Sequence, residues 1–262
     1  MTRRFVLFGQ VLALPVVLVV VWWFASASSQ SLYFPPLSRI VGVFPDTWVA
    51  GGGASRLVTD VLPSLARLTG GYAIAVALGI GAGLLIGSSP ALRALTEPVL
   101  EIFRAIPPPA VVPLLVALAG IDNLMKVLVI VFGCVWPILL NTVAGVRAVD
   151  PVLADTARCY GITGPARVRR LVLRSASPQI VTGMRQALSL GIILMVISEM
   201  FAASNGLGFT VVQFQRTFSI PEMWTGIIVL GLLGVCLSVG FRFVERRVLG
   251  WYDGQRQAHR HE

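Results

Sequence analysis

The chain has 262 residues, of which 56% are hydrophobic and 13% are charged, and its mean hydropathy is +0.82. A soluble globular domain carries roughly twice this fraction of charged residues. The composition therefore argues against a soluble protein and predicts a polytopic helical membrane protein. Its solid apolar runs argue against a closed barrel, whose strands would alternate in polarity.

The net charge is +9, from 21 basic and 12 acidic residues. Arginines on the cytoplasmic side of a membrane protein account for such an excess, so we expect the lipid bilayer, and no nucleic acid, as a partner. The three cysteines, Cys134, Cys159 and Cys236, form no CxxC pair, and both histidines lie in the C-terminal tail. The sequence therefore predicts no disulfide and no metal site.

Six apolar segments approach or exceed the roughly 20 residues that a helix needs to cross a bilayer. They lie at residues 6–24, 65–86, 99–119, 124–143, 184–203 and 223–243. The third contains three prolines from Pro107 and a fourth at Pro113. Because proline cannot donate to the helix ladder, we expect a surface helix at residues 91–105 that leads into a shorter, tilted span.

The first span admits a second interpretation. Arg3 and Arg4, an apolar run and the small residues at 25–27 resemble a secretory signal peptide. The apolar run is longer than a usual signal core, and Trp22 and Trp23 fit an interfacial aromatic belt. We therefore expect this span to be retained.

The arginines indicate the orientation of the six spans. With the N-terminus inside, sixteen basic residues fall on the inner side and five on the outer side. This bias fits the rule that cytoplasmic loops are rich in basic residues. We expect a single multi-pass transmembrane domain over residues 1–262, in the cell membrane, with both termini in the cytoplasm.

Small residues recur every four positions along the second span, at Gly71, Ala75, Gly79, Gly83 and Gly87. This spacing places them on one ridge of a helix. In lipid, such ridges let helix backbones approach closely and gain dispersion contacts. The ridge predicts packing within one subunit, or else a dimer seam or a moving gate, and the sequence does not separate these possibilities.

A polar, arginine-rich stretch at residues 153–183 separates two apolar spans. Asp150 and Pro151 mark the start of a short helix at residues 152–160, and Gly161 is a candidate C-terminal stop. Pro165 suits the first position of a second helix, which we expect to end at Ser175. The stretch is either a docking surface or an interfacial helix whose arginines reach lipid phosphates.

The spacing within this stretch resembles a known pattern. Asp155-Thr156-Ala157, three residues, Gly161, nine residues and Leu171-Val172-Leu173 are similar to the EAA loop of ABC-importer permeases, which runs Glu-Ala-Ala, three residues, Gly, nine residues and Ile-x-Leu-Pro. In that family the loop, here residues 150–183, inserts into a cleft on an ATPase subunit. The resemblance implies that the ATPase-coupling residues are Asp155, Thr156, Ala157, Gly161, Leu171 and Leu173. Two residues depart from the pattern: Asp155 replaces Glu and keeps its charge, whereas Arg174 replaces Pro.

Other segments resemble the nitrate/sulfonate/taurine-type permeases in the same order. They are Arg104 to Pro108, Leu139 to Thr142, and Ser198-Glu199-Met200 followed by Gly206-Leu207-Gly208. The resemblance implies an all-α fold like that of type I ABC importers. It also implies a second permease subunit, in a homodimer or a heterodimer, two ATPases inside and a solute-binding protein outside.

Two further observations bear on mechanism. The one lysine, Lys126, belongs to no Walker A loop, so we expect no enzymatic activity and no cofactor in this chain, with ATP and Mg held by a partner. We expect Lys126 to form an exposed i,i+4 pair with Asp122. Apart from Glu101, which falls in the expected surface helix at 91–105, Glu199 is the one acidic residue inside a predicted span, and such residues are functional candidates. It could line the path, relay a proton or bond the outer loop at 206–209.

The leading hypothesis is a permease subunit of an ATP-driven ABC importer, coupled to its ATPase through residues 152–175. The helix-packing or gate candidates are Gly79, Gly83, Gly87 and Glu199. The alternative is a secondary transporter driven by an ion gradient, which would need intramembrane charges, and only Glu199 qualifies. Nothing in the sequence selects the transported substrate.

Overall fold

The structure, a computed structural model, describes the backbone of residues 2–50, 55–201 and 203–258 and the side chains of 13–50, 55–201 and 203–252. Within these ranges it contains helices and no strand, which confirms the all-α prediction. The helices of the first half are α1 (Thr2–Ser26), α2 (Leu37–Trp48), the π-turn η2 (Leu57–Val61), α3 (Leu62–Ser88) and α4 (Pro90–Ala105). Those at the centre are the 3₁₀ turn η3 (Pro108–Val111), α5 (Val112–Ala119), α6 (Asn123–Arg147), α7 (Pro151–Cys159) and α8 (Gly164–Arg167). The π-turn η4 (Val168–Val172), α9 (Leu173–Phe201), α10 (Leu207–Arg216) and α11 (Ile220–Ala258) follow.

Four continuous helices in the described residues are long and apolar enough to span a membrane. They are Leu57–Ser88, Asn123–Arg147, Gly164–Phe201 and Ile220–Tyr252. A fifth span is broken, because α4 and the segment Pro108–Ala119 meet at 85°. The described part of α1 adds a shorter apolar helix, Ala13–Ser26, so the count is roughly consistent with six spans. Residue 202, within the predicted span 184–203, lies outside the described residues.

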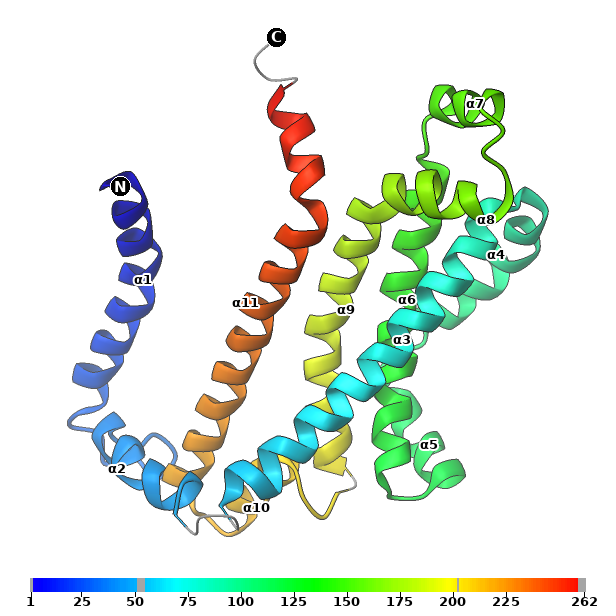
Figure 1. Cartoon of the computed structure of the whole chain (residues 1–262). Helices are drawn as coiled ribbons and strands as arrows, with labels where there is room; N and C mark the ends of the chain where they lie inside the picture. The colour runs from blue at the N-terminus through cyan, green and yellow to red at the C-terminus, as the bar shows by residue number, and fades with distance from the viewer. Residues whose placement is uncertain (1, 51–54, 202, 259–262) are drawn as a thin grey trace.

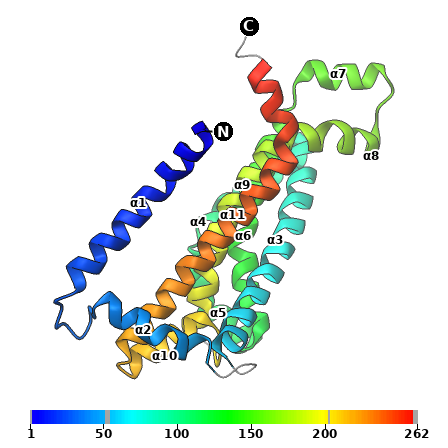
Figure 2. The same cartoon turned by 60° about the vertical axis from the view of Figure 1, so that its left-hand side comes forward.

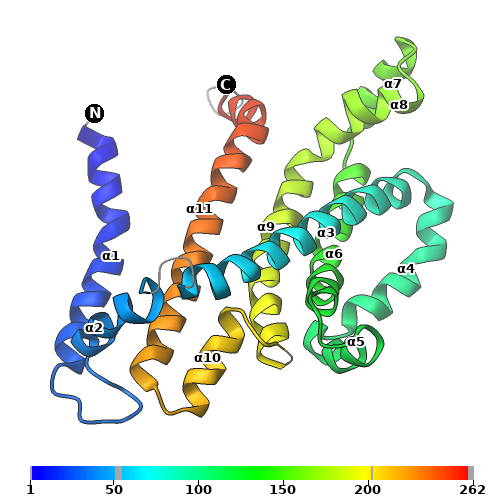
Figure 3. The ribbon, with the colours of Figure 1, turned by 60° about the horizontal axis from the view of Figure 1, so that its bottom comes forward.

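The centre of the bundle is formed by α3, α6 and α9, with α6 packed against both of the others (Figure 1). Figure 3 shows α3 running across α9 and α6. In all three views α1 lies beside α2 and apart from this central group, and Figure 2 shows the separation most clearly. At one end of the bundle lie α2, α5 and α10, while the start of α1, the end of α11 and α7 lie at the other.

The glycine ridge of α3 lies against α6 of the same chain. Each glycine faces the α6 residue whose number is higher by 59, so the two helices run parallel in constant register. The pairs are Gly71 with Ile130, Gly79 with Ile138, Gly83 with Thr142 and Gly87 with Val146. A Cβ atom on Gly83 would lie 2.5 Å from the Thr142 Cβ. No side chain fits between these backbones, so the candidate residues Gly79, Gly83 and Gly87 lie in a packed helix contact.

The third span is broken at the prolines from Pro107 onward, as the sequence predicts. Ser89 caps α4 by accepting a hydrogen bond from the Leu92 amide at 3.3 Å. At the other end, Pro107 is extended, with ψ of 122°, and the chain leaves the axis of α4 there. The predicted surface helix at 91–105 and the shorter segment after it therefore match α4 and the η3–α5 segment.

The expectation that the second helix of the polar stretch ends at Ser175 is wrong. The chain continues as one helix of 38 residues from Gly164 to Phe201. Pro178 lacks the amide that would bond to the Arg174 carbonyl, but the Ser177 hydroxyl donates to that carbonyl at 2.8 Å. Ala176 and Ile180 are buried in an apolar cluster with Val146. Tertiary packing and this substitute hydrogen bond carry the helix past the proline.

We predict that Gly83→Val weakens the α3–α6 contact, because its Cβ would clash with Thr142 of α6. Overpacking of this kind costs about 1–3 kcal/mol. Gly81→Val is the matched control, because an added Cβ there meets no atom within 4 Å. Thermal unfolding of the two purified variants measures the difference, and equal midpoints would contradict a space-limited contact.

Candidate functional site

The helix α7 has a well-defined start. The Asp150 carboxylate accepts a hydrogen bond from the Val152 amide at 2.7 Å, and Pro151 follows the cap. Proline suits this position because the first amides of a helix have no partner within it. The start signal predicted from Asp150 and Pro151 is confirmed.

The end of α7 is a Schellman motif. The Ile162 amide donates to the Ala157 carbonyl at 2.8 Å, and the Gly161 amide donates to the Arg158 carbonyl at 3.0 Å. Gly161 has φ of +67°, a left-handed conformation that is costly for residues with a Cβ. The predicted stop at Gly161 is confirmed, and this turn sends the chain back into α8.

The exposed surface of α7 is partly apolar. Val152, Leu153 and Tyr160 are 69%, 50% and 80% exposed, although α7 lies at one end of the molecule, past the ends of α3, α6 and α9 (Figures 1 and 2). Asp155 and Arg158 form an exposed ion pair on the same helix. A projecting helix with exposed apolar side chains and a fixed cap can serve as a protein-docking element.

The structure separates the six residues that the EAA resemblance implicates. Asp155 and Thr156 are exposed on α7, Ala157 is buried, and Gly161 forms the turn. In contrast, Leu171 and Leu173 are half-buried in the helix that follows, and Leu173 packs against the cluster around Val146 and Val172. Leu173 therefore packs at the base of the loop, and the exposed surface belongs to α7.

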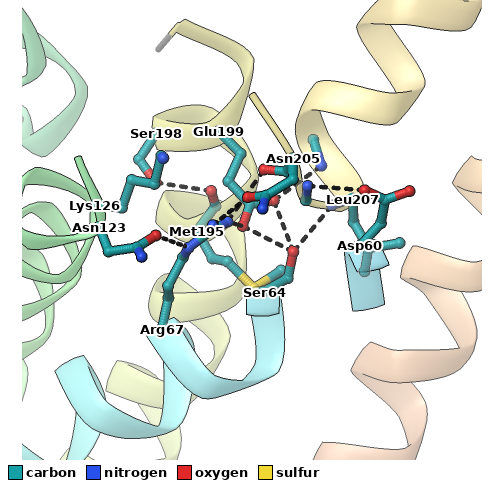
Figure 4. A network of polar contacts seen from close by, with 12 residues as sticks. Asp60, Ser64, Arg67, Asn123, Lys126, Met195, Ser198, Glu199, Asn205 and Leu207 are labelled. Atoms are coloured by element: carbon teal, nitrogen blue, oxygen red, sulfur yellow. Dashed lines mark hydrogen bonds and ion pairs between the residues drawn. The ribbon is translucent and has the colours of Figure 1, made fainter. Parts of the chain in front are cut away.

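A second candidate site lies at the opposite end of the bundle, around Glu199 (Figure 4). Glu199 is fully buried on α9. Its carboxylate accepts hydrogen bonds from Arg67 Nη1 at 2.7 Å, from Ser64 Oγ at 2.7 Å and from the Gly208 amide at 3.0 Å. Of the three roles left open for Glu199, the structure therefore shows a bond to the loop at 206–209, which the sequence analysis expects on the outer side.

Two further contacts attach this loop to the start of α3. The Ser64 hydroxyl accepts from the Leu207 amide at 2.9 Å, and Asp60 accepts from the Gly206 amide at 3.2 Å. Gly206 has φ of +118°, and a Cβ there would lie 2.5 Å from Glu199 Cδ. Both the backbone angle and the space therefore require glycine at this position.

Arg67 extends the same network toward α6. Its guanidinium donates to Asn123 Oδ1 at 2.7 Å and to the Asn205 carbonyl at 3.2 Å, and it also contacts the Asn205 side chain. Arg67 is 6% exposed, so its ion pair with Glu199 is buried on both sides. Such a pair is tolerated because further hydrogen bonds satisfy both partners. We name Asp60, Ser64, Arg67, Glu199 and Asn205 the outer polar network.

The sequence analysis missed most of this network and misplaced Lys126. Lys126 is 3% exposed, and its ammonium group donates to the Ile121 carbonyl at 3.4 Å, so the expected exposed pair with Asp122 is wrong. One signal was available: Asp60, Ser64 and Arg67 are spaced i, i+4 and i+7. That spacing puts them on one helix face, at the start of an otherwise apolar span.

We predict that Arg67→Met strongly destabilises the protein, because the Glu199 carboxylate would stay buried without its counter-ion. Breaking a buried pair costs about 3–5 kcal/mol. The double variant Arg67→Met with Glu199→Met should lose less than the sum of the single variants, because neither charge is then left alone.

Arg104→Met is the control for this cycle, because the Arg104–Glu101 pair is roughly half exposed and such pairs contribute about 0–1 kcal/mol. Thermal unfolding of the unmodified protein, the two single variants and the double variant gives the four stabilities that the cycle compares, and Arg104→Met is measured in the same way. Similar shifts for Arg67→Met and Arg104→Met would show that the outer polar network contributes little to stability.

Apolar spanning helices around a glycine-packed centre, with a capped helix projecting at one end, define a helical integral membrane protein. Residues 75–250 match the family described as binding-protein-dependent transport system inner membrane component. The chain belongs to this family, whose members lie in the cell membrane and act as permease subunits of ABC importers.

Relatives in this family are similar over most of their length. The taurine transport system permease protein TauC of Escherichia coli is 30% identical over 90% of this chain and 87% of its own. The putative aliphatic sulfonates transport permease protein SsuC of Bacillus subtilis is 27% identical over 93% and 88%. The nitrate import permease protein NrtB of Synechocystis is 27% identical over 89% and 86%. These relatives are ABC permeases and give no support to an ion-driven secondary transporter.

The fold also matches a solved structure. A chain of the inward-facing MetNI methionine ABC transporter superposes with a TM-score of 0.63 and 21% identity, over 76% of this chain and 99% of that one. The resemblance to an ABC-importer permease fold of the nitrate/sulfonate/taurine type is therefore confirmed.

Proposed function

We propose that α7 is the element through which a separate ATPase subunit drives this permease. The observation that carries the proposal is the exposed apolar surface of α7, formed by Val152, Leu153 and Tyr160, at one end of the molecule past the central helices α3, α6 and α9. Asp155, Thr156, Ala157 and Gly161 would fix the shape and charge of the docked helix. Leu171 and Leu173 would hold its base against the bundle.

Movement of α7 has a direct route through the chain. The turn at Gly161 leads into the helix Gly164–Phe201, which passes through the bundle to Glu199 in the outer polar network. A displacement of α7 by the ATPase would therefore tilt one long helix attached to the outer loop. In this proposal ATP and Mg are bound and ATP is hydrolysed by the partner chain, because this chain lacks a Walker A loop.

The arrangement of the ends supports the proposed orientation. The start of α1 and the end of α11 lie at the same end as α7, so all three would face the cytoplasm. A solute-binding protein would then dock at the end that carries α2 and α10. A second permease subunit, identical or related, would complete the translocation path. Relatives named for taurine, aliphatic sulfonates and nitrate point to a small sulfonate or oxyanion, which the binding protein would select.

We predict that Gly161→Val uncouples transport. Valine at φ of +67° is strained, so α7 would lose its capped turn and its position. A loss of about 1.4 kcal/mol in docking weakens binding tenfold, so we expect a drop of that order in co-purified ATPase and in ATP-dependent uptake by proteoliposomes.

Gly234→Val on α11 is the matched control, because it adds the same side chain where no atom lies within 4 Å. It should bind the ATPase and transport normally. Thermal unfolding of the Gly161→Val permease distinguishes a docking defect from a folding defect, since α7 projects from the bundle. Normal uptake and ATPase binding by Gly161→Val would overturn the assignment of α7.

A further inference from the structure

A groove runs between α9 and α11 at the α7 end of the bundle. The two helices lie side by side and run in opposite directions (Figures 1 and 3). Two hollows lie in the groove and share Leu173, Ser177 and Val248. They therefore form one continuous groove, with one part near the end of the bundle and the other deeper along the helices.

The end part of the groove has the character of a membrane–water boundary. It is a hollow of about 630 Å³, lined by Leu173, Arg174, Ser177, Val248 and Trp251. Tryptophan is enriched at membrane interfaces because its ring is apolar and its N–H is polar. Trp251 is 45% exposed and stacks edge-on against Tyr252. This part of the groove therefore suits a ligand with a polar head.

Arg174 gives this hollow a positive charge. Among the side chains that the structure describes, none forms an ion pair or a hydrogen bond with its guanidinium. The Ser177 hydroxyl is used within the helix, because it donates to the Arg174 carbonyl. Arg174 also stands where the EAA pattern has proline. Its guanidinium thus offers several free donors in a geometry that fits a phosphate.

The deeper part of the groove is apolar and smaller in volume. It is a hollow of about 200 Å³ whose apolar walls come from α3, α9 and α11. These walls are Ile80, Ile180, Val181, Met184, Phe241 and Val244. Glu245 is the one acidic lining residue, and it is paired with Arg185, so its charge is balanced. This shape and chemistry fit an acyl chain.

The surrounding charge favours an anionic occupant. Residues 164–185 carry five arginines and no acidic residue, and residues 241–252 carry three arginines and one glutamate. Basic pockets between helices at the cytoplasmic side of a membrane bind anionic lipid head groups. A soluble anion would use Arg174 but leave the apolar hollow empty, whereas a phospholipid fills both.

We propose that the α9–α11 groove binds one anionic phospholipid of the inner leaflet, with its phosphate on Arg174 and an acyl chain between Ile180, Val181 and Val244. The inference rests on the proposed orientation, in which the α7 end faces the cytoplasm. The bound lipid would lie directly after the proposed coupling loop, against the first turns of α9.

The test uses the full transporter complex in nanodiscs that contain phosphatidylethanolamine and phosphatidylglycerol in equal amounts. Native mass spectrometry counts the lipids that each complex retains after release from the disc. We expect phosphatidylglycerol to be retained in preference to phosphatidylethanolamine. Arg174→Gln should lower its retention about tenfold, the effect of losing one charge-assisted contact. Arg147→Gln is the control, because Arg147 is an exposed arginine at the same end but on α6.

A second pair of variants tests the acyl-chain part of the groove. Val244→Trp should fill the deeper, apolar hollow of the groove and also lower phosphatidylglycerol retention. Val239→Trp is the matched control. Val239 lies on the same helix and is 55% exposed, compared with 52% for Val244, but it does not line the groove. It should retain lipid like the unmodified protein.

Several outcomes would overturn the proposal. Equal retention of the two lipids, or unchanged retention in Arg174→Gln, would exclude an anion site at Arg174. Displacement of the lipid by sodium phosphate, with no effect of Val244→Trp, would indicate a soluble-anion site. Disulfide-linked dimers of Val244→Cys, in a background with Cys159→Ser and Cys236→Ser, would show that a second copy covers the groove. Lipid retention does not depend on ATPase docking, so its failure is distinguishable from failure of the α7 assignment.

Discussion

The close approach of the α3 and α6 backbones is the contact on which the rest of the structure depends. Within a bilayer, water supplies no hydrophobic force between helices, so their association relies on dispersion contacts and hydrogen bonds. Four glycines of α3 provide those contacts by facing Ile130, Ile138, Thr142 and Val146 at a constant offset. A glycine of α9 packs against α6 in the same way, because a Cβ on Gly183 would lie 2.6 Å from the Pro137 carbonyl oxygen. The three helices are thereby packed closely together, and the two ends of this unit carry different kinds of side chain.

The two ends of the bundle differ in how their functional side chains are placed: at one end they are buried and hydrogen-bonded, and at the other they are exposed. At the end that carries α10, charges are buried and paired: Glu199 is fully buried, and Arg67, Ser64 and Gly208 donate hydrogen bonds to it. This network fixes the turn before α10. At the other end, α7 leaves apolar side chains exposed and relies on its cap and its Schellman motif for shape. A satisfied buried network resists rearrangement, whereas an exposed helix is open to a partner, so each end has the character that its proposed role needs.

Features set by local chemistry could be predicted from the sequence. The start and stop of α7 follow from Asp150, Pro151 and Gly161, whose effects depend on neighbouring backbone groups alone. The break after α4 follows in the same way from its prolines. The glycine ridge was visible as a period of four, although the identity of its partner helix was not. Features that depend on distant residues were missed. The sequence analysis placed Lys126 in an exposed pair and assigned no role to Arg67, because the burial of both is created by residues far away in the sequence. The helix expected to end at Ser175 continues past Pro178 because the Ser177 hydroxyl replaces the missing hydrogen bond and Ala176 is buried against other helices, and the latter is a tertiary contact.

The helix that the sequence analysis cut short is the one that connects these features. Because Gly164–Phe201 is continuous, the turn after α7, the α9–α11 groove and Glu199 all lie on one element. A ligand in the groove would contact this helix between its two functional ends, close to Arg174 and Ser177. A lipid there would stabilise whichever tilt of α9 keeps the groove open, since a ligand shifts an equilibrium only by its difference in affinity for the two states. If the groove binds a phospholipid as proposed, the arginine at the family's proline position puts the phosphate-binding charge on the helix that would transmit movement from α7.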